Sequence, residues 1–173
     1  MGGSLADELG GAFAEVPVEV AALRLAAALV LGGLVGAERE WRLKPAGLRT
    51  HILVSVAACL FVLVGLEVSA LGFGEGGEKR IDPLRLIEAV TAGVAFLAAG
   101  LIFTSGGRVR NVTTGASLWL AGAIGLASGA GQIPLAAMAT VLVIAVLSLV
   151  RAAERGLGTH AADAREDDIA DDA

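Results

Sequence analysis

The sequence predicts an all-α, polytopic membrane protein, built as a compact bundle of about five transmembrane helices. Three observations support this fold class. Of 173 residues, 55% are apolar and only 18% are charged, with a mean hydropathy of +0.75. The charges are crowded into a few short stretches, and five apolar segments separate them. A soluble domain needs about a quarter of its residues charged to cover its surface, so a soluble globular protein is excluded.

The five apolar segments are bounded by charged residues or by glycine and proline. Each is close to the about 20 residues that a helix needs to cross a 30 Å hydrocarbon layer. The fourth is short and rich in glycine, so its boundaries are the hardest to place. The expected spans are Val16–Gly36, His51–Leu71, Leu84–Phe103, Thr113–Gly129 and Ile133–Val150.

The chain therefore divides into an N-terminal segment (1–15), a transmembrane helical domain (16–151) and an acidic tail (152–173). The first apolar segment has no basic region before it and is interpreted as a retained span rather than a cleaved signal peptide. The tail has six carboxylates between Asp163 and Asp172 against Arg165, and we expect it to be disordered. Without these charges the net charge of −5 is close to zero, so nucleic acid is not an expected partner.

Lysine and arginine residues indicate the orientation of the bundle. Eight of them fall in the first and third connections and after the last span, whereas the other side has three. Basic residues in short loops favour the cytoplasmic side. We therefore expect the N-terminus outside and the C-terminus in the cytoplasm. The eight are Arg39, Arg42, Lys44, Arg49, Arg108, Arg110, Arg151 and Arg155; the three are Lys79, Arg80 and Arg85.

Small residues recur along one face of three spans, and such faces let membrane helices pack closely. These stripes predict a tight bundle with little room for a wide pore. The first span has Arg24, Ala28, Gly32 and Gly36; the third has Glu88, Ala92, Ala95 and Ala99; the fourth has Thr114, Ser117, Ala121, Gly125 and Ser128.

Three ionisable residues, Arg24, Glu67 and Glu88, lie inside the spans near the outer surface. Ionisable groups within a membrane usually face protein or water and usually pair. Arg24 and Glu88 each begin a small-residue stripe, so we expect these two to form an intramembrane ion pair. A functional relay or ion site is the alternative. Glu67 shares its face with leucines and is expected to extend to the interface.

Two polar patches lie in connections that the topology places at the cytoplasmic surface. The first covers residues 38–51, where Pro45 ends any helix and Gly47 permits a tight turn. The second covers residues 104–114, and we expect the two patches to meet. Their surplus of cations is typical of anchoring to anionic lipid. Alternatively, the hydroxyl and imidazole groups form a hydrogen-bonded platform that orients Arg49 and Arg110 for a partner or an anion.

No enzyme or cofactor chemistry is expected from the residue types present. Cys59 is the only cysteine, so neither a disulfide framework nor a thiolate metal site is available. The sequence has no histidine, cysteine and carboxylate cluster at metal-ligand spacing, and no nucleophile with a base nearby. The residues do not decide whether magnesium or another ion binds.

Several motifs of this sequence resemble those of the MgtC/SapB family of bacterial inner-membrane proteins. Their order and spacing match from about residue 20 to residue 150, and the run from Lys44 to His51 is the most specific. Ala98-Ala99 departs from the glycine that is usual in the family. The motifs are Gly36-Ala-Glu-Arg-Glu40, Lys44-Pro-Ala-Gly-Leu-Arg-Thr-His51, Asp82-Pro-Leu-Arg85, Gly100-Leu-Ile-Phe103, Val109-Arg-Asn-Val-Thr-Thr114 and Ser117-Leu-Trp119.

The resemblance implies an inner-membrane regulatory protein linked to growth at low magnesium and to stress or virulence adaptation. It also implies a membrane partner, with the F-type ATP synthase as the first candidate. A small ion or solute transporter or channel, within one subunit or between subunits of a homo-oligomer, is the alternative. Many members carry a soluble domain after the last span, where this sequence has the acidic tail. The residues that match the family's polar motifs are Glu38, Arg39, Glu40, Lys44, Arg49, Thr50, His51, Asp82, Arg85, Arg108, Arg110, Thr113 and Thr114.

Overall fold

The computed structural model describes residues 15–70 and 83–156. Two features predicted from the sequence, the outer-side residue Asp82 and the part of the disordered tail beyond residue 156, lie outside these described residues, as does most of the N-terminal segment. The described elements, in chain order, are α2 (Val18–Trp41), α3 (Leu48–Ala70), α4 (Pro83–Leu101), β1 (Phe103–Ser105), β2 (Arg108–Arg110), α5 (Val112–Gly129) and α6 (Ile133–Gly156).

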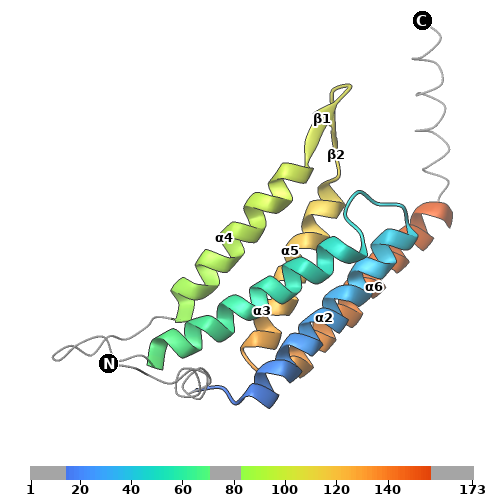
Figure 1. Cartoon of the computed structure of the whole chain (residues 1–173). Helices are drawn as coiled ribbons and strands as arrows, with labels where there is room; N and C mark the ends of the chain where they lie inside the picture. Colours follow the sequence, from blue (N-terminus) through green and yellow to red (C-terminus); the bar gives the residue numbers. More distant parts are fainter. Residues whose placement is uncertain (1–14, 71–82, 157–173) are drawn as a thin grey trace, which may run out of the picture.

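Five helices of the described chain are long and apolar enough to cross a membrane, which confirms the predicted fold class. Figure 1 shows α4 along one edge of the bundle and α2 with α6 along the other, with α3 and α5 between them. The helix contacts agree with this view, because α5 packs against all four of the other helices. The protein is therefore a multi-pass bundle organised around α5.

The face of α5 that contacts α3 consists of small residues. The predicted stripe of Thr114, Ser117, Ala121, Gly125 and Ser128 is buried along its whole length. A Cβ atom added to Gly125 would overlap the backbone carbonyl group of Ser55 on α3. One turn later, a Cβ atom at Gly129 would lie 2.7 Å from the carbonyl oxygen of Cys59. The backbones of α3 and α5 are therefore in direct contact.

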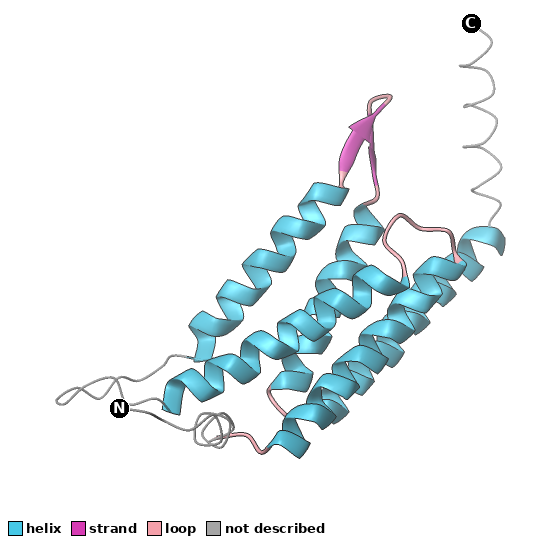
Figure 2. Ribbon diagram, in the orientation of Figure 1, coloured by secondary structure: helices cyan, strands magenta, loops and turns pink. Residues whose placement is uncertain are grey.

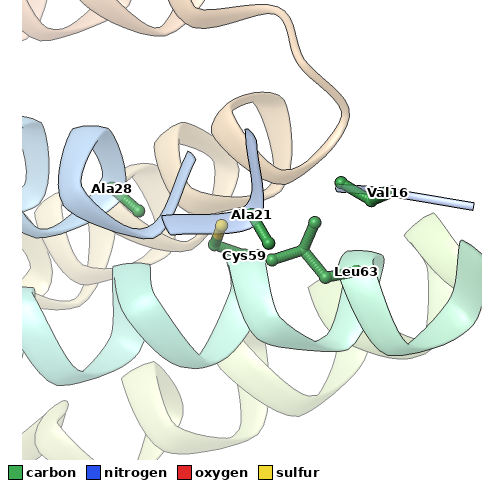
Figure 3. Close-up of a cluster of buried hydrophobic side chains, with 5 residues drawn as sticks. All are labelled: Val16, Ala21, Ala28, Cys59 and Leu63. Atoms are coloured by element: carbon green, nitrogen blue, oxygen red, sulfur yellow. The ribbon is translucent and has the colours of Figure 1, made fainter. Parts of the chain in front are cut away.

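The predicted small-residue stripe on α2 is also confirmed, and it packs against α3. Ala28, Gly32 and Gly36 are buried, and a Cβ atom on Gly32 would lie 2.5 Å from the Cβ of Ser55. The hydroxyl of Ser55 donates a hydrogen bond to the carbonyl oxygen of Ala28 at 2.9 Å. Toward the opposite end of the same two helices, an apolar cluster closes the interface. Figure 3 shows its members, Val16, Ala21, Ala28, Cys59 and Leu63.

The stripe predicted on α4 is wrong. Glu88, Ala92, Ala95 and Ala99 are exposed, and α4 instead buries the larger residues Val90 and Val94, together with Ala98. The physical reason lies in the partner helix, because α5 already supplies the small residues at this interface. A Cβ atom at Gly122 of α5 would lie 2.9 Å from a methyl group of Val94. Large side chains of α4 thus fill the grooves that glycine leaves on α5.

The second polar patch forms a β-hairpin that the sequence analysis did not predict. β1 and β2 pair antiparallel, with Phe103 opposite Arg110 and Ser105 opposite Arg108. The turn is made by Gly106 and Gly107, with φ of +60° and +75°, a conformation that residues with a side chain seldom adopt. The hairpin extends beyond the helices at one end of the bundle (Figure 2). We call this end, with the α2–α3 loop and the C-terminal part of α6, the hairpin end.

The contact between α3 and α5 gives a stability prediction with a matched control. Gly125→Ala forces the backbone of Ser55 away, and overpacking of this kind costs about 1–3 kcal/mol. Gly93→Ala on α4 has no atom within 4 Å to meet, so it should be neutral or stabilising by up to about 1 kcal/mol. Thermal unfolding of both variants in detergent measures the difference. Equal melting temperatures would contradict the close contact.

Candidate functional site

The two predicted polar patches come together at the hairpin end. Arg39, in the last turn of α2, is 4% exposed, and its Nη2 donates a hydrogen bond to Thr114 Oγ1 at 3.1 Å. Thr114 lies in the first turn of α5, where backbone groups have no helical partner. A buried guanidinium without such acceptors would be strongly destabilising. The hydrogen bond therefore connects the start of the first patch to the end of the second.

A second buried hydrogen bond joins α3 to α5 beside the first. His51 is fully buried, and its Nδ1 lies 2.8 Å from the carbonyl oxygen of Gly47. Because a carbonyl only accepts, Nδ1 carries the proton. Nε2 lies 3.2 Å from the hydroxyl of Ser117, and the single hydrogen of that hydroxyl is shared between Nε2 and the carbonyl oxygen of Thr114, 2.9 Å away. His51 thus has a structural position inside the platform rather than on its surface.

Glu40 stabilises the turn between α2 and α3. Its Oε2 accepts a hydrogen bond from the backbone N–H of Leu48, the first residue of α3, at 2.7 Å. A Cβ atom at Gly47 would lie 2.7 Å from the same carboxylate oxygen, so a larger residue here would displace the Glu40 side chain. Leu43 has a φ of 53°, which lets the chain leave α2 abruptly. The first patch therefore has a fixed backbone, as the proline and glycine of the sequence suggested.

A cleft of about 410 Å³ opens between α2, the hairpin and α6. One part of its wall is polar and another part is apolar, with the apolar side chains contributed mainly by α6. The polar lining residues are Glu38, Arg39, Arg42, Lys44, Asn111, Thr113 and Thr114. The apolar lining residues are Val109, Val112, Val146, Leu147 and Val150.

Glu38 is the acidic residue of this cleft, and it is the most confined of its charged side chains apart from Arg39. Its side chain is 10% exposed, and Oε1 accepts a hydrogen bond from Arg42 Nε at 3.0 Å. The other oxygen, Oε2, is buried and has no hydrogen-bond donor within the described part of the chain. Arg42 also lies over the ring of Trp41, with 5.5 Å from its Cζ to the ring centroid.

The other predicted site residues form two groups, those that line the cleft and those that lie outside it. Lys44, Thr113 and Thr114 line the cleft as the two patches suggested. Arg49, Arg108 and Arg110 are exposed and do not line it, and Thr50 is half-buried in the first turn of α3.

Sequence reasoning missed Asn111, and it counted Arg42 only as a cation of the loop. Asn111 begins α5 in the left-handed conformation, with a φ of 65°. Its Nδ2 donates to the carbonyl oxygen of Leu101 at 3.1 Å, so it ties the end of α4 to the start of α5. Its place after a Gly-Gly hairpin was the available signal, because asparagine tolerates positive φ better than most residues.

The structure does not bring Arg24 and Glu88 together, which corrects the predicted ion pair. Arg24 Nη1 donates to the carbonyl oxygen of Gly129 at 2.8 Å, at the C-terminus of α5. Glu88 is exposed on α4, at the far edge of the bundle, whereas α2 packs against α3, α5 and α6. The last carbonyls of a helix have no intrahelical donor and carry partial negative charge, so a guanidinium stabilises them. Arg24 therefore caps α5.

Two further ionisable residues, Glu67 and Arg85, lie at the opposite end of the bundle. Glu67 accepts a hydrogen bond from the backbone N–H of Val16 at 2.9 Å, so it holds the chain that leads into α2. Arg85 is exposed near the start of α4. Within the described residues, no group of three or more histidine, cysteine or acidic side chains could hold a metal ion.

These features define a class: a multi-pass membrane protein whose helices pack through small residues and whose hairpin end carries a fixed polar surface with a cleft. The profile of the MgtC family matches residues 25–156. The chain is 44% identical over 135 residues to Protein MgtC of Brucella abortus (strain 2308), which covers 78% of this chain and 53% of that protein. It is 38% identical over 131 residues to Protein MgtC of Salmonella typhimurium (strain LT2), covering 76% and 52%.

The chain therefore belongs to the MgtC family, as the motifs indicated. It spans about half the length of these curated relatives. No solved structure matches the chain significantly.

The hydrogen bond between Arg39 and Thr114 gives a prediction for the site. Thr114→Val keeps the side-chain shape but removes the acceptor from a buried guanidinium, which should cost about 1–3 kcal/mol of stability. Thr113→Val, at the exposed neighbouring position, should change stability by less than about 0.5 kcal/mol. Thermal unfolding of both variants in the same detergent compares them. If the two variants have the same melting temperature, the buried hydrogen bond does not stabilise the hairpin end.

The position of Arg24 gives a second prediction. Arg24→Leu should destabilise the protein by about 1–3 kcal/mol, because the carbonyl of Gly129 loses its donor. Glu88→Leu should have little effect, and the double variant should equal the sum of the single variants within about 0.5 kcal/mol. A double-mutant cycle on unfolding in detergent measures the coupling. A coupling free energy well above about 0.5 kcal/mol would show that Arg24 and Glu88 form an ion pair after all.

Proposed function

We propose that the chain is a regulatory protein of the bacterial inner membrane, which acts by binding a membrane protein partner through its hairpin end. The observation that carries this proposal is the pair of buried hydrogen bonds, from Arg39 to Thr114 and between His51 and Ser117. They fix two loops that are distant in sequence into one polar surface. A surface with a fixed shape can recognise a partner, since little conformational entropy is lost on binding.

Exposed cations on this surface support the partner role. Lys44, Arg49 and Arg110 are exposed, and Arg49 and Arg110 lie outside the cleft. Arginine presents a planar fork of donors that suits carboxylates of another protein. The excess of basic residues at this end favours its placement in the cytoplasm. By family resemblance, the F-type ATP synthase is the first candidate partner, and growth at low magnesium is the first condition to examine.

The packing of the bundle supports regulation over transport. The backbones of α3 and α5 touch at Gly125 and Ser55, and α2 also approaches α3 at Gly32, where an added Cβ atom would lie 2.5 Å from the Cβ of Ser55. These contacts leave no room for a path between the three helices. A transporter or channel, within one subunit or between subunits, is the competing function, and ion or solute flux is therefore the competing outcome of the test. We propose no catalytic activity for the chain.

The test combines partner capture with growth. The full chain carrying an affinity tag is purified from its host membrane in mild detergent, with and without magnesium limitation, and co-purifying membrane proteins are identified. The double variant Arg49→Ala and Arg110→Ala should lose the partner and fail to complement growth at limiting magnesium. Arg49→Lys should lose most of the binding, because lysine keeps the charge but not the fork.

Arg85→Ala, at the opposite end of the bundle, is the matched control and should keep both partner and growth. Membrane abundance of each variant shows that the protein is still inserted. If the double variant retains the partner and complements fully, the hairpin end is not the binding surface. If purified wild-type protein in liposomes conducts ions instead, the transport alternative replaces regulation.

A further inference from the structure

The cleft at the hairpin end has a composition that selects its ligand. The charged groups that line it are one carboxylate, Glu38, and three cations, Arg39, Arg42 and Lys44. Arg39 and Arg42 already bond to Thr114 and Glu38, so the charge they present is fixed in place. The surplus of positive over negative charge in the cleft attracts an anionic group. A volume of about 410 Å³ lies within the usual range for a small-molecule site.

Glu38 adds a requirement that an anion alone cannot meet. Its side chain is nine-tenths buried, since it is 10% exposed. Its Oε2 is buried and receives no hydrogen bond from the described residues. A buried carboxylate oxygen without a donor is destabilising, and an N–H donor with positive charge satisfies it best. The ligand should therefore present a cationic N–H group close to its anion.

The apolar part of the wall adds a third requirement. Val146 and Val150 on α6 and Val112 at the start of α5 are each about half exposed, although they line the same cleft. They lie where a membrane-spanning helix reaches the surface of the bilayer. Apolar side chains in this position suit a hydrocarbon chain that continues from a polar head.

We propose that this cleft binds the headgroup of an ethanolamine phospholipid. The ammonium group donates to the carboxylate of Glu38, and the phosphate lies against Arg42 and Lys44, with the Thr113 hydroxyl as a further donor. The ammonium and the phosphate of this headgroup are separated by two methylene groups, so both can contact one small cleft. The acyl chains lie along Val146 and Val150. The proposal rests on the cleft alone and does not depend on the partner protein.

Choline lipid is the discriminating ligand, because its three methyl groups remove every N–H donor but keep the positive charge. The purified full chain in detergent is titrated with short-chain phosphatidylethanolamine, phosphatidylcholine and phosphatidylglycerol, and binding is followed by native mass spectrometry. The wild-type protein should bind the ethanolamine lipid about ten-fold more tightly than the choline lipid, as expected for a hydrogen bond to a charged group.

Glu38→Gln should bring the ratio between the two lipids close to one, because the negative charge that favours the ammonium is lost. Glu88→Gln, an exposed position on α4, is the matched control and should keep the wild-type ratio. Thr113→Phe narrows the cleft from the α5 side and should weaken the binding of both lipids. If Glu38→Gln does not fold, the wild-type ratio together with Thr113→Phe decides the question.

Four outcomes would overturn the proposal. Equal affinity of the wild-type protein for the ethanolamine and choline lipids would remove the role of Glu38, as would a preference that survives Glu38→Gln. Tighter binding of phosphatidylglycerol than of the ethanolamine lipid would show that the site recognises only the anionic group. Free phosphoethanolamine binding as tightly as the lipid would point to a soluble ligand. The Arg49 and Arg110 variants should leave the lipid ratio unchanged, which separates failure of this proposal from failure of the proposed partner role.

Discussion

The contact between the backbones of α3 and α5 is the constraint on which the rest of the structure depends. It requires a residue without a side chain at position 125, directly against the carbonyl group of Ser55. In a bilayer the hydrophobic effect does not drive helices together, so close packing of small residues does. Since α5 touches every other helix, its distance from α3 fixes the position of all of them. The candidate site depends on the same distance, because Ser117 must reach His51.

Small and large residues are divided between the helices in a consistent way. α5 and α2 provide small faces, and α4 fills the grooves of α5 with Val90 and Val94. At the hairpin end the buried residues Arg39 and His51 have hydrogen-bond partners, whereas Oε2 of Glu38 is buried without a donor among the described residues. Burial of a charged group is tolerated when its hydrogen bonds are made. The bundle thus combines close contacts of α2 and α5 with α3 and a polar surface of fixed shape.

Much of the fold follows from the sequence, because length and apolar character are properties of each segment alone. The five spans, the stripes on α2 and α5 and the meeting of the two polar patches were all predicted from residue types and loop order. The order of helices around the bundle was not, since no single segment carries it. Because the order of the helices was not predicted, two predictions were wrong. The small face of α4 was assigned to the interior, and Arg24 was paired with Glu88 instead of the carbonyl of Gly129. The hairpin was missed although Gly106 and Gly107 signal its turn.

The burial of α5 has a consequence for how the protein is made. Among the five spans, α5 is the least apolar and the most enclosed by protein, whereas α6 is the most apolar and among the least enclosed. A glycine-rich helix gains little from transfer out of the translocon into lipid. During synthesis, α2, α3 and α4 emerge before α5 and already offer the grooves that it fits. Retention of α5 in the bilayer is therefore a cooperative step of assembly. A substitution that disrupts the surface of α3 would be seen first as failed insertion of α5.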